Sequence, residues 1–164
     1  MLSTSFDVPS RVVQNRGRGY LRDRNGVFVN PRYADVSYKY AGGGMLSTVE
    51  DLARFAIALN NGTLLTAEAV REMYEVQLDS SVRRFVHDGN PEPLEHKQAI
   101  VWWIRTDANG RDFPSHTGTV KGTRSFLMNY PELGIVVALQ VNSLPFDAAK
   151  YGMAIAQMFA ATAR

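Results

Sequence analysis

Apolar residues recur at helical spacing early in the chain. In "LSTVEDLARFAIALNNG" the apolar positions are Val49, Leu52, Phe55, Ala56 and Leu59. Steps of three and four residues place such side chains on one face of a helix. Ser47 and Glu50 have the spacing of a capping box, which predicts that Ser47 caps this helix, and Asn61-Gly62 is a natural stop.

The same pattern predicts two further helices. "LLTAEAVREMYEV" has Thr66 as its N-cap and places Val70, Met73 and Tyr74 on its inward face. "FDAAKYGMAIAQMFAATAR", the last segment, has Asp147 as a cap, followed by alanine, methionine, isoleucine and phenylalanine at helical spacing. Two helices therefore stand early in the chain and one stands at its end.

From residue 99 the pattern changes to that of strands. "AIVWWIRT" is β-branched and aromatic, and the "DANGRD" after it contains an Asn-Gly turn signal. "TRSFLMNY" alternates, with Phe126, Met128 and Tyr130 on one side, and "PELG" makes the next turn. "IVVALQVN" is nearly continuously apolar, as expected for an interior strand. Helices, then an antiparallel meander, then a helix predict an α+β fold.

Two segments lack a sustained period. Residues 1–44 are rich in Gly, Pro, Asn and Arg, with one short candidate strand at 26–30, and "YKYAGGG" (38–44) reads as a tight turn feeding the first helix. Residues 77–98 are polar, mixed in charge and broken by Pro91 and Pro93, which predicts a long loop or insertion. The chain is thus predicted to be a single domain. Its parts are an irregular lead-in (1–44), a helical part (45–76), the loop (77–98), and antiparallel strands with a C-terminal helix (99–164).

Composition and charge narrow the classes of function. With 18 basic and 16 acidic side chains the net charge is +2, which gives no electrostatic reason to expect a nucleic-acid partner. There is no cysteine, so disulfides and thiolate metal sites are excluded, and neither a metal nor an organic cofactor is predicted. No apolar run approaches the ~20 residues that span a bilayer. The first residues lack the pattern of a signal peptide, and the compartment stays open.

Candidate chemistry is concentrated in "FPSHTGTVKG" (113–122), where His116, Thr117 and Gly118 precede a second Gly-flanked turn. Two interpretations stand on these residues. The tripeptide is either the polar end of a strand before a turn or one wall of a catalytic site. Taken alone, the tripeptide favours the first interpretation. The neighbouring Trp102 and Trp103 are interpreted as core or pocket rim.

The flanking residues resemble the serine β-lactamase-like family, which includes penicillin-binding DD-peptidases, class C β-lactamases, related esterases and a mitochondrial branch. "AGGGMLSTVEDLARF" and "HTGTVKGTRSFLMNYPELGIVVALQVN" carry the resemblance, and "DVSYKYAGGGMLST" is particularly similar to the mitochondrial branch and its bacterial relatives. The resemblance implies a partial β-lactamase/transpeptidase-like α+β fold: two helices from the helical region, antiparallel strands, and a C-terminal helix packed on the sheet.

The resemblance also implies a site. His116-Thr117-Gly118 takes the place of the family's Lys-Thr-Gly or His-Thr-Gly strand, which stands opposite the nucleophile. The backbone amide of Thr119 would be one of two oxyanion-hole donors, and Gly118 would let the substrate carbonyl approach closely. His116, when protonated, and the Thr117 hydroxyl would bind a substrate carboxylate. The chemistry implied is acyl transfer to water from a lactam, peptide or ester.

Two other family motifs are absent from the 164 residues. No serine is followed three residues later by lysine, and there is no Tyr-x-Asn, Tyr-x-Ser or Ser-x-Asn. The chain therefore looks like the C-terminal part of a serine hydrolase, inactive by itself, whose nucleophile lies in another segment. The alternative is a non-catalytic module that binds a partner or ligand. Since family members place a strand of the other segment beside 135–142, that strand is expected to offer an open edge for self-association or for pairing with a partner.

Overall fold

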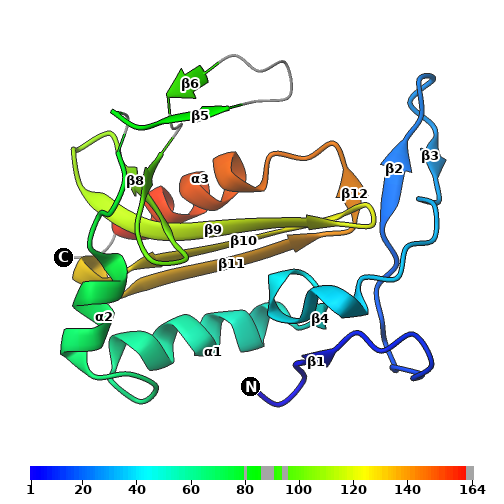
Figure 1. Ribbon diagram of the computed structural model, residues 1–164, viewed down its shortest axis with the longest axis horizontal. Helices are drawn as coiled ribbons and strands as arrows, with labels where there is room; N and C mark the ends of the chain where they lie inside the picture. Colours follow the sequence, from blue (N-terminus) through cyan, green and yellow to red (C-terminus); the bar gives the residue numbers. More distant parts are fainter. Residues whose placement is uncertain (80, 86–90, 94–95, 162–164) are drawn as a thin grey trace.

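A five-stranded antiparallel sheet with helices on both faces forms the body of the molecule (Figure 1). The computed structural model describes residues 1–79, 81–85, 91–93 and 96–161. In the sheet, the strand order is β11-β10-β9-β8-β7. These strands are β7 (Lys97–Gln98), β8 (Trp103–Thr106), β9 (Asp112–Val120), β10 (Thr123–Tyr130) and β11 (Ile135–Val141). Helices α1 (Val49–Asn60) and α2 (Ala67–Tyr74) cover one face and α3 (Ala148–Ala160) covers the other. The predicted α+β fold is confirmed.

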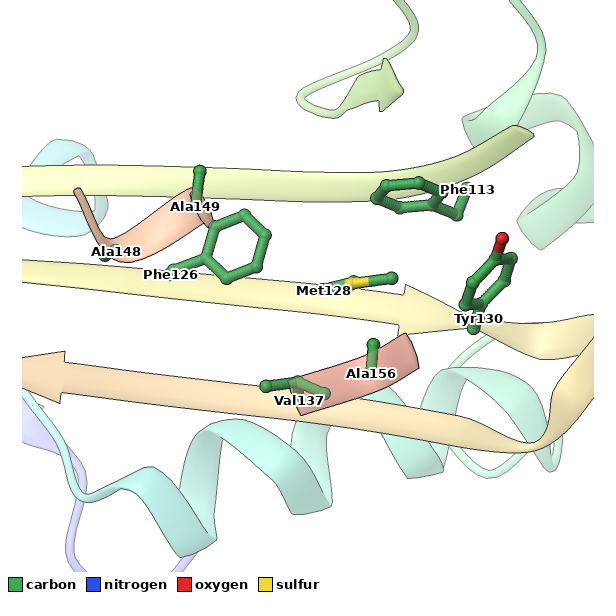
Figure 2. Close-up of a cluster of buried hydrophobic side chains, with 8 residues drawn as sticks. All are labelled: Phe113, Phe126, Met128, Tyr130, Val137, Ala148, Ala149 and Ala156. Atoms are coloured by element: carbon green, nitrogen blue, oxygen red, sulfur yellow. The ribbon is translucent and has the colours of Figure 1, made fainter. Parts of the chain in front are cut away.

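The face of the sheet under α3 holds the larger buried cluster (Figure 2). Phe126, Met128 and Tyr130 alternate along β10 and point to this face, as their spacing predicts. The helix contributes small side chains, and at Gly152 a Cβ atom would lie 2.3 Å from Cδ1 of Phe126. Because real Cβ atoms do not come that close, glycine is what lets α3 pack directly on the Phe126 ring.

The opposite face is fixed to α1 and α2 by apolar packing and by one buried polar network. Trp102 is buried there, in agreement with its interpretation as core. Asn129 of β10 is fully buried, exchanges hydrogen bonds of 2.7 and 2.8 Å with Asn60 of α1, and donates to the Tyr74 hydroxyl of α2. A buried amide without these partners would lose its hydration uncompensated, so the network sets where both helices lie.

The apolar run of β11 has a different cause from the one predicted. β11 is the edge strand of the sheet among the described residues, not an interior strand. Its residues are apolar on both sides because one face packs against α3 and the other against α1: Val137 belongs to the first cluster, and Val136 and Ala138 to the second. A continuous apolar pattern reports burial of both faces, whatever the number of neighbouring strands.

Of the three predicted helix N-caps, the structure confirms two and contradicts one. Thr66 and Asp147 each accept a hydrogen bond from an amide of the first turn, as predicted. The prediction for α1 was wrong by one residue, since Thr48 and not Ser47 is its N-cap and accepts from the Asp51 amide. The capping box with Glu50 is therefore not formed.

Residues 1–44 contain more regular secondary structure than their sequence predicts. Within 1–44 there are β1 (Ser5–Phe6), β2 (Tyr20–Arg22), β3 (Phe28–Val29) and η1 (Ser37–Gly42). β1 pairs with β4 (Met45–Leu46), and β2 pairs with β12 (Ser143–Leu144). The remaining short element is η2 (Pro131–Leu133). These pairings are between residues far apart in the chain, so a local pattern does not reveal them.

The segment 77–98, predicted as a long loop or insertion, contains the short antiparallel pair β5 (Arg83–Phe85) and β6 (Pro91–Pro93). Residues 80, 86–90 and 94–95 lie outside the described residues. In the part of the chain that is described, no helix has both the length and the apolar character needed to cross a bilayer.

The turn between β8 and β9 is held by a charged network at its base. Asp107 accepts hydrogen bonds from the Tyr130 hydroxyl and from Arg111, whose Nε lies 3.0 Å from the carboxylate. The bond from Tyr130, opposed by partial burial, holds the pKa of Asp107 well below its ordinary value. Burial and the Asp107 charge raise the pKa of Tyr130 to about 12. The network fixes the start of β9, the strand that carries the candidate residues.

Candidate functional site

The strand β9 has a free edge over the residues that the sequence singles out. β10 pairs with β9 from Ser115 to Val120, but β8 pairs with it only from Asp112 to Ser115. β8 begins at Trp103, opposite Ser115, so it covers only one end of the long β9 (Figure 1). Among the described residues, no strand lies beside 116–120 on that side.

The turn between β9 and β10 fixes which backbone groups face that edge. Lys121 and Gly122 are its two central residues, with φ of 48° and 76°. Two positive φ angles in a two-residue turn are the type I′ geometry. In such a hairpin the flanking residues, Val120 and Thr123, form a hydrogen-bonded pair.

Hydrogen-bonded and non-hydrogen-bonded pairs alternate along antiparallel strands. Counting back from Val120, the backbone groups of Gly118 and His116 bond to β10. The N–H and C=O of Thr119 and Thr117 therefore point to the free edge. Outside the strand ladders, no backbone hydrogen bond among the described residues reaches either amide. Thr119 thus presents an unused backbone donor to the space beside the sheet.

His116 lies at the start of this edge with an exposed side chain. Its ring stacks on Trp103, with centroids 5.0 Å apart and an interplanar angle of 26°. Trp103 is thus a rim residue, the second of the two interpretations given for the tryptophans. Partial burial against this ring lowers the pKa of His116 below its ordinary value of 6.5, and a hydrogen bond with the Thr117 backbone opposes the shift only in part. The lowered pKa disfavours the imidazolium, so the predicted binding of a carboxylate by a cationic His116 requires a lower pH than it would for a free histidine.

Thr117 and Gly118 face opposite sides of the sheet, and each lines a cavity. Thr117 lines one of about 570 Å³ together with Trp103 and Lys150. Gly118 lines one of about 830 Å³ on the other side. A Cβ at residue 118 would lie 3.0 Å from Oγ of Ser125, closer than an ordinary contact. The free edge of β9 therefore lies between these two cavities.

Arg124 is the residue of this region that sequence reasoning missed. It lies opposite Thr119 on β10, lines both cavities, and its Nε is buried with no hydrogen-bond partner in the described residues. The sequence did contain a signal for Arg124. In "TRSFLMNY", Arg124 shares the alternation of Phe126 and Met128, so a cation occupies a position on the inward side of a strand.

The family follows from comparison with known proteins. The Beta-lactamase family model matches residues 1–160, so the chain belongs to the beta-lactamase family. It is 33% identical over 147 residues to the human "Serine beta-lactamase-like protein LACTB, mitochondrial", and the match covers 80% of this chain. The chain spans only 27% of that relative's length.

Solved structures show the same fold. The octameric penicillin-binding protein homologue from Pyrococcus abyssi superposes with a TM-score of 0.75 at 23% identity, over 97% of this chain and 34% of that one. A D-stereospecific amidohydrolase from Streptomyces sp. gives a TM-score of 0.60 at 21% identity, over 87% and 39% of the two chains. The predicted β-lactamase/transpeptidase-like fold is thus confirmed for this portion of the family's chain.

Proposed function

We propose that this chain forms one wall of the acyl-transfer site of a serine hydrolase that cleaves a lactam, peptide or ester with water. The observation that carries the proposal is the free amide of Thr119 on an open strand edge. A donor already engaged in the sheet could not bind a developing oxyanion. A preorganised N–H donor that faces a cavity can bind the oxyanion.

The residues around that amide have separate roles. Thr119 N–H is one oxyanion donor, and the nucleophile's own amide is the other. Gly118 allows close approach of the reacting carbonyl. The Thr117 hydroxyl, near the cation of Arg124, binds a substrate carboxylate. His116 acts as a hydrogen-bonding group, and partial burial, which lowers its pKa, favours the neutral ring.

The nucleophile of this site belongs to polypeptide outside the 164 residues, since no serine in them stands in a Ser-x-x-Lys sequence. The same observation supports a second candidate function, a non-catalytic module that holds an acyl ligand or a partner without turning it over. The two functions differ in whether the full protein contains a nucleophilic serine that lies opposite this wall of the site.

Activity measurements separate the two functions. We expect the 164-residue chain to hydrolyse neither a chromogenic cephalosporin nor a p-nitrophenyl ester above the buffer rate. We expect the longer in-frame product of its gene to carry a Ser-x-x-Lys sequence and to hydrolyse one of them. Turnover by the short chain alone would contradict the placement of the nucleophile. A longer product without a Ser-x-x-Lys sequence would support the second function, the non-catalytic module.

We also propose that the free edge of β11 pairs with another strand, from a second copy or a partner. Tyr130, Met128, Phe126 and Arg124 bond to β11 by the same alternation that governs β9, which leaves the groups of Val136, Ala138 and Gln140 facing outward. An apolar edge strand with unused backbone groups and little charge is prone to pairing.

Sedimentation velocity tests this edge. We expect the chain to associate as its concentration rises, and the variant Gln140→Pro to associate less. Gln140 is exposed and its N–H faces outward, so proline there removes an edge donor without breaking a bond to β10. A monomer at all concentrations, or association equal in both proteins, would count against the pairing.

A further inference from the structure

The larger cavity beside Gly118 is lined by an unusual concentration of positive charge. Five cationic side chains line it: Arg16, Arg18, Arg32, Lys121 and Arg124. The single carboxylate among its lining residues is that of Asp7. The whole chain has a net charge of only +2, so this cluster is not the result of a generally basic composition.

Two of the five cations are already matched by carboxylates. Asp7 is buried and binds Arg16 with both oxygens, at 2.7 and 2.8 Å, while Nζ of Lys121 lies 3.7 Å from it. Hydrogen bonds with Ser37 lower the pKa of Asp35, and the charge of Lys121 contributes to the same shift to a smaller extent. These contacts tie the lead-in segment to the turn after β9 and close that side of the cavity.

The other three cations have no such match. Within the described residues, no carboxylate lies within 4.0 Å of Arg18, Arg32 or Arg124. Nε of Arg124 is buried without a hydrogen-bond partner, although a buried guanidinium donor without a partner loses its hydration uncompensated. Three arginines that no carboxylate matches therefore line the cavity, and one of them, Arg124, also has a buried Nε without a partner.

Some cations elsewhere in the described chain do have carboxylate partners. Arg54 lies 2.9 Å from Asp51, Lys97 lies 2.6 Å from Asp112, and Arg111 is paired with Asp107. The cavity keeps three arginines whose planar donor groups fit carboxylate or phosphate oxygens.

We propose that this cavity binds a small polyanion, a molecule that carries at least two negative charges as carboxylates or phosphates. Its volume of about 830 Å³ is that of a small-molecule site. Arg18 and Arg32 hold the ligand from the lead-in segment, and Arg124 holds it from β10. Arg124 is shared with the proposed acyl-transfer site, but Arg18 and Arg32 line only this cavity, so variants at these two residues test the polyanion site separately.

Isothermal titration of the 164-residue chain with inorganic pyrophosphate and with citrate tests the site. We expect at least one of them to bind with 1:1 stoichiometry, and more weakly as salt is raised. Arg18→Gln and Arg32→Gln should each weaken binding about tenfold, since each removes hydrogen bonds to a charged group. Both side chains are exposed and are not part of any ion pair among the described residues, so these variants are expected to fold.

The matched control is Arg71→Gln, an exposed arginine on α2 outside the cavity, which should leave the Kd unchanged. Binding of pyrophosphate alone identifies a phosphate ligand, and binding of citrate alone a carboxylate ligand. The proposal is overturned if neither binds, or if Arg71→Gln weakens binding as much as Arg18→Gln.

Discussion

Replacing Thr119 by proline is expected to lower kcat of the protein that carries the nucleophile about 10²–10³-fold, the typical loss of one oxyanion donor. Proline removes the backbone N–H and nothing else that the sheet uses. The register places that N–H at the free edge of β9, so the ladder to β10 stays intact. Steady-state kinetics with the preferred chromogenic substrate measure the effect.

Thr119→Ser is the matched control, because it changes the side chain and keeps the amide. We expect its kcat to stay close to that of the original protein. Equal losses in the two variants would assign the effect to the side chain. Unchanged kcat in Thr119→Pro, with circular dichroism showing an intact fold, would mean that this amide does not contact the reacting carbonyl.

Replacing Phe126 by alanine is expected to reduce the free energy of unfolding by about 3–5 kcal/mol. The side chain has 0% exposure and lies between β10 and α3 (Figure 2). Gly152 of α3 packs directly against its ring. Removing the ring leaves a cavity that neighbouring alanines are too small to fill. Urea or guanidinium unfolding followed by circular dichroism gives the difference.

Phe28→Ala provides the comparison. The ring of Phe28 is 51% exposed and has the guanidinium of Arg22 at 4.3 Å from its centroid. Loss of that exposed contact should cost less than about 1 kcal/mol. If the two variants lost similar stability, the sheet and α3 would not form the principal core.

The lower pKa of His116 changes one expectation drawn from the sequence. A free histidine would be partly protonated near neutral pH and could attract a carboxylate. Partial burial disfavours the charged ring, which lies stacked on Trp103. The sequence places the two residues thirteen positions apart, and only the pairing of β8 with β9 brings them together.

Local patterns were sufficient for the elements whose apolar residues face one core. The spacing of Phe126, Met128 and Tyr130 predicted their common side because a strand alternates with period two. Caps at Thr66 and Asp147 were readable because a cap depends on a few adjacent residues. At Ser47 the same reasoning failed, since two neighbouring hydroxyl residues both fit a cap and the contacts of the lead-in decide between them. Ser47 instead bonds to the Thr4 hydroxyl at 2.8 Å.

The sequence by itself determined the α+β class and the family resemblance, singled out 116–119 as candidate site residues, and shows no Ser-x-x-Lys. Each of these depends on residue identity and short spacing. The tertiary structure alone decided that β8 begins opposite Ser115 and leaves 116–120 uncovered, that the Thr119 amide faces this free edge, and that arginines from the lead-in and β10 line one cavity. These features depend on which strands end where and on contacts between distant residues, and no local period encodes them.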